Sequence, residues 1–208
     1  MGASAAKTVQ MNNTRRRLLA DNTTWREGGQ VCPAPLQVMI SGMTLGFRKA
    51  ALPEEAAELW KLDVEIFGVD SFAPEDWLSL ESYWILVDGS VAGCAAFIHD
   101  VEFGEDLLGD GKNVAQRGTL YIQSTGLRKE FRGRGVGSGV KAWQIDYARR
   151  NGFGRIVTNC RESNAAMIDI NRKFGFRIIR TTPGYYGDGE ATVVMELLLE
   201  QDGTDRNP

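Results

Sequence analysis

The stretch Arg132-Gly133-Arg134-Gly135-Val136-Gly137-Ser138-Gly139 decides how this sequence is interpreted. It follows an apolar segment, 119–127, that is typical of a strand, and it opens a segment of helical periodicity that runs to about residue 150. Glycines between a strand and a helix leave backbone N–H groups free to bind an anion, and the helix N-terminus adds positive charge. Two arginines supply further donors. The stretch predicts a pyrophosphate-binding turn, although an arginine- and glycine-rich surface turn would have the same composition.

Spacing separates the known kinds of phosphate-binding turn. A dinucleotide fingerprint needs G-x-G-x-x-G, but the sixth position is Ser138 when counting from Gly133 and Val140 when counting from Gly135. A Walker A loop needs glycine directly before its lysine, and Val140 precedes Lys141. The spacing that fits is [RQ]-x-x-G-x-[GA], which Arg132, Gly135 and Gly137 satisfy.

Periodicity and turn residues divide the rest of the chain. Asp88-Gly89 predicts a hairpin turn between two strands, because glycine accepts a positive φ without strain. Strands are predicted over 44–49, 83–87, 91–98, 119–127, 155–160, 176–181 and 192–199. Helices are predicted over 53–67, 74–80, 136–150 and 163–174, and a polar loop over 100–116. This order predicts a mixed α/β sheet with helices on both faces in residues 43–200, after an N-terminal extension, 1–42, and before a tail, 201–208.

Composition narrows the class of protein. Among 208 residues, 43% are hydrophobic and the net charge is −3, which gives no electrostatic reason to expect nucleic acid as a partner. No apolar stretch approaches the roughly 20 residues of a membrane span. The start carries three arginines and no acidic residue, as a transit peptide would, but a flexible extension is the simpler interpretation. Three scattered cysteines predict neither a metal site nor disulfides, and they favour the cytoplasm. A catalytic Cys160 thiol is the alternative role for one of them.

The motif at Arg132, Gly135 and Gly137 resembles the coenzyme A loop of the GNAT superfamily of N-acetyltransferases. The segment from Ser163-Asn164 to Gly175-Phe176 is similar to the helix that follows in that superfamily, and the order of elements over 44–199 also agrees. The resemblance implies a GNAT fold, with a mostly antiparallel sheet splayed at its central strands, and transfer of acetyl from acetyl-CoA to a primary amine without a metal. It also implies that the cofactor is bound by Leu127, Arg132, Gly133, Arg134, Gly135, Val136, Gly137, Asn164 and Asn171. Asn164 is equally suited to capping its helix.

The catalytic residues follow the superfamily pattern less closely. Asn171 stands where relatives place a tyrosine acid. Leu120-Tyr121-Ile122, Phe67-Gly68-Val69 and Tyr185-Tyr186 resemble segments of protein Nα-acetyltransferases, including those that act on bacterial ribosomal proteins. That resemblance implies catalysis by Tyr121 and acceptor binding by Phe67, Val69, Tyr185 and Tyr186.

Two departures from this pattern remain. Asn159 stands where the eukaryotic type pairs its tyrosine with a histidine, and Gly68 and Ser71 replace a proline and a tyrosine. His99, the only histidine, is a second candidate base because its unperturbed pKa lies near 6.5.

Three functions are therefore compatible with the sequence. The favoured one is acetylation of a peptide or protein N-terminal α-amine. The others are acetylation of a small amine, such as an antibiotic, polyamine or amino acid, and a non-catalytic acyl-CoA-binding module. The missing tyrosine and histidine keep the last alternative open. The sequence contains no indication of the oligomeric state.

Overall fold

The computed structural model describes residues 36–40, 42–99 and 118–199. Within them an eight-stranded sheet has the order β1-β2-β3-β4-β5-β6-β8-β7. Its strands are β1 (Leu36–Ile40), β2 (Met43–Lys49), β3 (Glu81–Val87), β4 (Ser90–His99), β5 (Thr119–Leu127), β6 (Arg155–Arg161), β7 (Arg177–Thr182) and β8 (Thr192–Leu198). The helices are α1 (Ala56–Phe67), α3 (Val136–Arg150) and α4 (Ala165–Lys173), with short 3₁₀ turns η2 (Gly68–Asp70), η3 (Asp76–Ser79) and η4 (Lys129–Phe131). None of the helices in these ranges is long and apolar enough to span a membrane.

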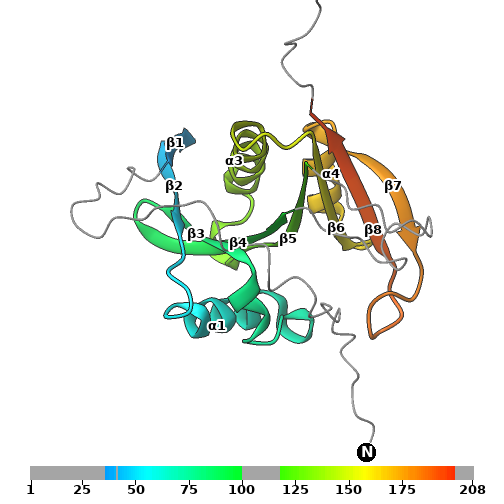
Figure 1. The fold of residues 1–208 in the computed structure, drawn as a ribbon, viewed down its shortest axis with the longest axis horizontal. Helices are drawn as coiled ribbons and strands as arrows, with labels where there is room; N and C mark the ends of the chain where they lie inside the picture. The colour runs from blue at the N-terminus through cyan, green and yellow to red at the C-terminus, as the bar shows by residue number, and fades with distance from the viewer. Residues whose placement is uncertain (1–35, 41, 100–117, 200–208) are drawn as a thin grey trace, which may run out of the picture. The chain divides into compact units, whose positions relative to one another are not determined.

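The helices cover opposite faces of the sheet, as predicted (Figure 1). One core lies between the sheet and the pair α3 and α4, where the rings of Phe47 and Trp143 stack 3.9 Å apart. A second core lies between the sheet and α1, and it buries Leu59, Trp77 and Trp84. Because side chains alternate along each strand, every sheet residue belongs to one of these two faces.

Local sequence explains the best predicted elements. Asp88 and Gly89 both adopt positive φ, 49° and 79°, which is the geometry of a tight hairpin turn. The Asp88 carboxylate also accepts a hydrogen bond from the backbone N–H of Thr44 at 2.8 Å, which joins the turn to β2. The hairpin predicted from Asp88-Gly89 is therefore present.

Three segments differ from the prediction. The helix predicted over 74–80 is only the 3₁₀ turn η3 (Asp76–Ser79). β1 lies inside the predicted extension, 1–42, and pairs antiparallel with β2 through Gly42, whose φ of 82° suits a tight turn. The first helix begins at Ala56 and not at Pro53, because Glu55 holds the preceding turn: its carboxylate accepts the backbone N–H of Ala51 and the guanidinium of Arg48. The loop 100–116, most of residues 1–42 and the tail 201–208 lie outside the described residues.

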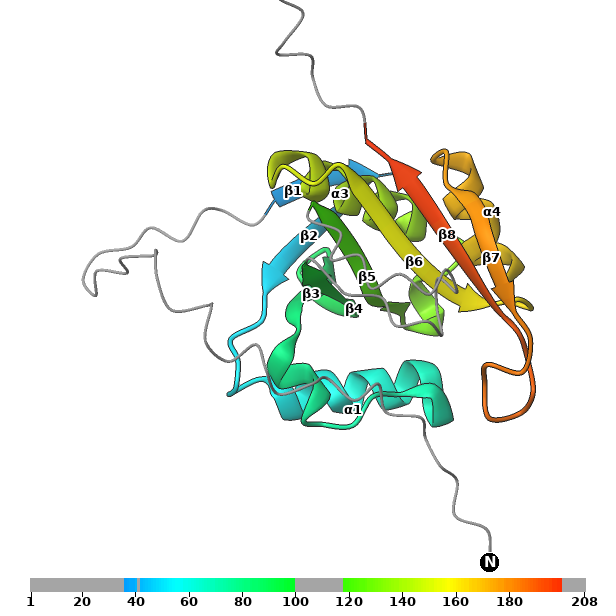
Figure 2. The same cartoon turned by 45° about the vertical axis from the view of Figure 1, so that its right-hand side comes forward.

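The sheet opens between β5 and β6. These two strands run parallel, unlike the other neighbours, and they pair only from Thr119↔Arg155 to Ile122↔Thr158. Beyond that point β5 continues to Leu127 and β6 to Arg161 without pairing to one another (Figure 2). A bulge contributes to the divergence, because Gln123 is an extra residue in β5 between two residues that pair with adjacent positions of β4. This opening is the splay expected of a GNAT sheet.

Candidate active site

The glycine-rich turn joins β5 to α3 through η4, and its backbone is shaped by glycine. Gly133 and Gly135 have φ of 72° and 83°, a conformation that other residues adopt only with strain. Gly135 is the N-cap of α3, and no side chain caps the helix there. The first N–H groups of a helix lack partners within it, so this exposed turn presents donors and a positive helix end to solvent. It has the chemistry of an anion site.

The neighbouring residues of the turn serve packing as well as binding. Arg132 donates from Nε to the carbonyl oxygen of Leu127 at 2.8 Å, which fixes the turn to the end of β5. A Cβ on Gly137 would lie 3.1 Å from the Ile170 side chain, so this glycine lets α3 and α4 approach. Gly139, for which the sequence predicts no particular role, has the strictest requirement, since a Cβ there would lie 1.9 Å from the Ile40 side chain.

Two asparagines of α4 differ in their surroundings. Asn164 is exposed and caps the helix, because its Oδ1 accepts the backbone N–H of Met167 at 3.2 Å. Asn171 is completely buried, and its amide nitrogen lies 3.5 Å from the sulfur of Met195. Its Oδ1 has no hydrogen-bond partner among the described residues. A buried carbonyl without a partner costs about 1–3 kcal/mol, so a ligand atom or a water at this position would be stabilising.

These features fit the parts of coenzyme A. The turn offers backbone donors for a pyrophosphate, and the unpaired edges of β5 and β6 offer hydrogen bonds to an arm that carries amides. The residues predicted from the sequence to bind the cofactor are compatible with that role, which remains a prediction.

Tyr121 lies on the α1 face of β5 and takes part in a chain of hydrogen bonds. Its hydroxyl donates to Oδ1 of Asn159 at 2.5 Å, and Nδ2 of Asn159 donates to the hydroxyl of Thr192 at 3.0 Å. Thr192 in turn donates to the carbonyl oxygen of Cys160 at 3.2 Å. The phenol packs against Val157 and is 4% exposed. Burial, and then the neighbouring tyrosines 185 and 186, raise the pKa of Tyr121 far above its usual value. The phenol is therefore protonated at neutral pH.

His99, the second candidate base, lies on the other face of the sheet from Tyr121. In the register of β4 and β5, Ile98 is opposite Tyr121 and His99 is opposite Leu120. Alternation therefore places His99 on the α3 face. There its Nε2 lies 3.0 Å from a carboxylate oxygen of Glu81 and 3.2 Å from the hydroxyl of Tyr147. The structure offers His99 no role beside Tyr121.

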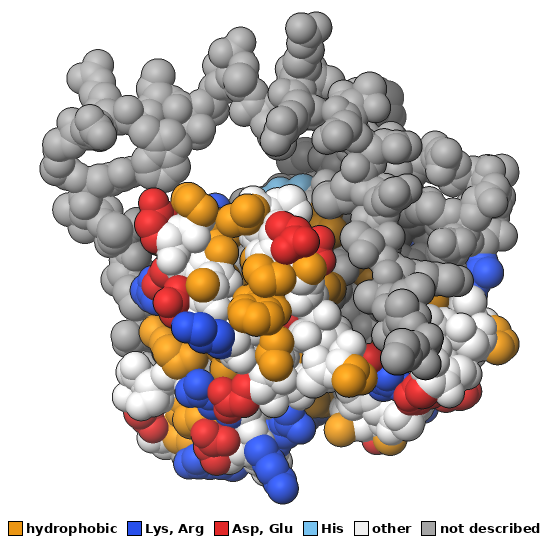
Figure 3. Space-filling model, turned by 90° about the horizontal axis from the view of Figure 1, so that it is seen from below, with side chains coloured by type: hydrophobic (Ala, Val, Ile, Leu, Met, Phe, Trp, Pro, Cys, Tyr) orange, Lys and Arg blue, Asp and Glu red, His pale blue; other side chains and the backbone are white. Residues whose placement is uncertain are grey.

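The predicted acceptor residues come from two segments on the α1 face. The Phe67 ring packs on the end of β5, where a Cβ on Gly126 would lie 2.8 Å from it. Val69, in the 3₁₀ turn η2, is 97% exposed. Tyr185 and Tyr186 lie in the connection between β7 and β8, and their rings meet edge to face at 5.2 Å. Figure 3 shows this side of the molecule, where hydrophobic side chains alternate with acidic and basic ones.

Sequence reasoning missed two charged residues on this face. Arg161, at the end of β6, binds the carboxylates of Asp70, Asp188 and Glu190. Asp63 of α1 is 1% exposed, and its Oδ2 accepts the backbone N–H of Phe72 at 2.8 Å. Burial raises the pKa of Asp63 to about 6, although the hydrogen bond from Phe72 opposes the rise. The hydrophobic spacing of α1 could have revealed Asp63 as a polar residue on a buried face, whereas the partners of Arg161 are too distant in sequence to be foreseen.

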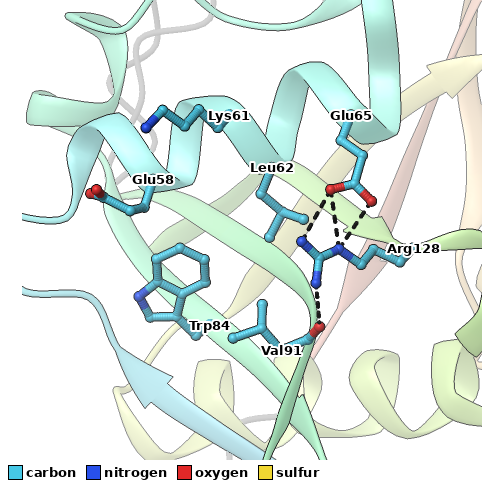
Figure 4. A pocket seen from close by; sticks show the side chains of 7 residues that line it. All are labelled: Glu58, Lys61, Leu62, Glu65, Trp84, Val91 and Arg128. Carbon is cyan, nitrogen blue, oxygen red and sulfur yellow. Dashed lines mark hydrogen bonds and ion pairs between the residues drawn. The ribbon is translucent and has the colours of Figure 1, made fainter.

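A separate cavity of about 370 Å³ lies between α1 and the strands β3 and β4 (Figure 4). Arg128 extends across it, with its guanidinium 3.0 Å from a Glu65 carboxylate oxygen and 3.0 Å from the carbonyl oxygen of Val91. None of the site residues predicted from the sequence lines this cavity. The full lining is Glu58, Lys61, Leu62, Glu65, Trp84, Val91 and Arg128.

Comparison with known proteins agrees with this geometry. A family model described as Acetyltransferase (GNAT) family matches residues 52–176. N-alpha-acetyltransferase 50 of Danio rerio is 34% identical over 68 residues, which are 32% of this chain and 40% of that protein, so the chain spans less than half of that relative. The probable N-acetyltransferase san of Drosophila melanogaster is 27% identical over 135 residues, which are 64% of this chain and 69% of that protein.

A solved structure shares the fold. The ribosomal-protein-S18-alanine N-acetyltransferase of Escherichia coli superposes with a TM-score of 0.62 and 14% identity, over 78% of this chain and 99% of that one. The family model covers more than half of the chain and includes the glycine-rich turn and the splayed strands. This chain therefore belongs to the GNAT acetyltransferase family.

Proposed function

We propose that this enzyme acetylates an α-amine, namely the N-terminus of a peptide or protein. The observation that carries the proposal is the pair of Tyr121 and Asn159. A phenol that burial keeps protonated donates to a neutral amide, on the face that carries the predicted acceptor residues. Such a pair supplies a proton donor and no base.

Proton energetics favour an acceptor that needs little help from a base. An α-amine has a pKa of about 7.7–8.0, so roughly a quarter to two fifths of it is neutral at pH 7.5. A lysine amine has a pKa of about 10.4, and only about a thousandth of it is neutral at the same pH. A site whose central pair offers no ionised base therefore suits the α-amine better.

The residues have distinct roles in this proposal. The turn around Gly135 holds the pyrophosphate of acetyl-CoA, whose thioester supplies the acetyl group. The amine nitrogen would bond to the acetyl carbon as the C–S bond breaks, and the Tyr121 hydroxyl would protonate the leaving sulfur, directly or through a water. The phenol would regain a proton from the acylated nitrogen by the same route. Asn159 accepts the Tyr121 hydrogen bond and fixes the orientation of the phenol. Val69 and the tyrosines 185 and 186 form the walls for the peptide end.

The resemblance to other enzymes supports the same acceptor class. The relative from Danio rerio is named for acetylation of α-amines, and the Escherichia coli enzyme of the same fold is named for the alanine of a ribosomal protein. Both names concern protein N-termini.

The test uses two matched peptides. One has a free N-terminus and a blocked lysine, and the other has a blocked N-terminus and a free lysine. Release of free thiol at pH 7.5, with the product identified by mass, should be faster for the first peptide. The Gly135→Asp variant, which should not bind acetyl-CoA, is the control for thiol release that does not depend on the active site. Faster acetylation of the lysine peptide would refute the proposal, and acetylation of neither would favour a small amine as acceptor.

A further inference from the structure

Arg161 is the last residue of β6, two positions beyond Asn159 and on the same face of the sheet. Its side chain is 22% exposed. The guanidinium holds Asp70 in a bidentate pair, with Nε 2.6 Å from Oδ2 and Nη2 2.8 Å from Oδ1. Nη1 donates to Asp188 at 2.8 Å and to Glu190 at 2.5 Å. All three nitrogens of the guanidinium are therefore engaged.

The three carboxylates belong to two different loops. Asp70 lies in η2, next to the exposed Val69. Asp188 and Glu190 lie in the connection between β7 and β8, which also carries Tyr186. A single guanidinium thus connects the two segments that are predicted to bind the acceptor.

Arg161 also fixes an aromatic wall. Its guanidinium carbon lies 4.1 Å above the centre of the Tyr186 ring, within the range of a cation–π contact. The backbone N–H of Tyr186 donates to the carbonyl oxygen of Glu190 at 3.1 Å. The Glu190 carboxylate in turn accepts the backbone N–H of Ser163 at 2.8 Å, just before α4. The ring is therefore held by Arg161 from above and by the backbone of its own loop.

Stability alone does not account for this arrangement. Asp188 is 59% exposed and Asp70 29% exposed, and ion pairs accessible to solvent contribute little to stability. A planar guanidinium that makes bidentate and stacked contacts does, however, fix geometry closely. Such a residue therefore fixes the positions of the groups around it more than it raises the free energy of unfolding.

We propose that Arg161 is a positioning residue for the acceptor amine, because it joins η2 to the β7–β8 connection and holds the ring of Tyr186. This inference rests on the proposed function, since both loops are assigned to the acceptor there. Arg161 itself does not touch the reacting atoms.

The test compares Arg161→Gln and Arg161→Lys with Arg155→Gln. Arg155 is a matched control, because it lies on the same strand and forms a similar ion pair with Glu196 at 2.6 Å, away from the two loops. Steady-state rates are measured with the best amine acceptor of the unchanged enzyme, together with hydrogen exchange of residues 68–72 and 183–190. Arg161→Gln should raise the acceptor KM and lower kcat/KM by up to about a hundredfold, the cost of misplacing a substrate by about 1 Å. The KM for acetyl-CoA should stay within about twofold, and both loops should exchange faster.

The other variants sharpen the result. Arg161→Lys should raise the acceptor KM less than Arg161→Gln does, because lysine keeps the charge but cannot form the bidentate pair. Arg155→Gln should leave the acceptor KM and both loops unchanged. Unaltered exchange in the two loops of Arg161→Gln would overturn the inference, and so would an unaltered acceptor KM. If the unchanged enzyme acetylates neither matched peptide, the proposed function fails, while the exchange data and the KM for whichever amine it accepts still decide the role of Arg161.

Discussion

Removing the hydroxyl of Tyr121 tests the proposed chemistry most directly. Tyr121→Phe keeps the ring, which packs against Val157 and Val194, and deletes only the group that donates to Asn159. Loss of one positioned acid lowers kcat by about a hundred- to ten-thousandfold. Expressed as a barrier, this is about 2.7–5.4 kcal/mol. The acetyl-CoA Kd should remain nearly unchanged, because the hydroxyl lies on the α1 face and the glycine-rich turn begins α3.

The same substitution has a separate effect on stability. Oδ1 of Asn159 loses its donor, and a half-buried acceptor left without one costs about 1–3 kcal/mol. This loss would be measured by urea unfolding, so that a folding defect is not mistaken for a catalytic one. Tyr147→Phe is the matched control, because it removes a phenolic hydroxyl from the opposite face, beside His99.

Turnover is measured by thiol release at saturating acetyl-CoA and peptide. Tyr147→Phe should retain the kcat of the unchanged enzyme, whereas Tyr121→Phe should not. A Tyr121→Phe enzyme that folds, binds acetyl-CoA and turns over at the original rate would refute the assignment of Tyr121 as the acid.

Two further predictions concern the cofactor turn and a buried acid. Gly135→Asp should abolish acetyl-CoA binding in calorimetry, because the position has a φ of 83° that strains other residues and because a carboxylate would repel the phosphates; retained affinity would mean that the phosphates bind elsewhere. Asp63 has a folded-state pKa of about 6 against an ordinary value of 3.8, so the unfolded chain ionises first as pH rises. The contribution of Asp63 to the free energy of unfolding should therefore fall by roughly 3 kcal/mol between about pH 4 and pH 6, because each pH unit between the two pKa values removes about 1.36 kcal/mol. Asp63→Asn should lack this fall in urea unfolding, and equal pH dependence in both proteins would contradict it.

Much of the fold could be predicted because the signals are local. Strand β5 has the predicted bounds, 119–127, and α3 begins where the glycine spacing places it. The two glycines with positive φ in the turn explain why a motif of a few residues is informative: other residues would be strained there. β1 was not predicted, since a run of only five residues becomes a strand only through pairing with β2.

The parts of the site that depend on distant contacts were less predictable. His99 and Tyr121 are both polar residues of neighbouring strands, and only the register shows that they face opposite ways. Arg161 looks like any charged residue at a strand end, and its role emerges only when loops from both ends of the sequence meet it. Asn159 departs from the histidine of the eukaryotic type, yet the structure shows that it contacts Tyr121 directly.

Because β5 and β6 pair over only a short length, a ligand bound between their unpaired ends would also affect how long the protein stays folded. Four residue pairs provide the strand pairing between the first five strands of the sheet and the last three. A ligand whose amides bridge the unpaired strand ends would supply the missing part of that pairing. Its binding at a hundred times the Kd would stabilise the fold by about 2.7 kcal/mol. Free coenzyme A carries the same arm as its acetylated form, so the spent product would protect the enzyme from unfolding and proteolysis as well as the substrate does. The abundance of this enzyme in a cell would then follow the total pool of coenzyme A, whereas its rate would follow the acetylated fraction.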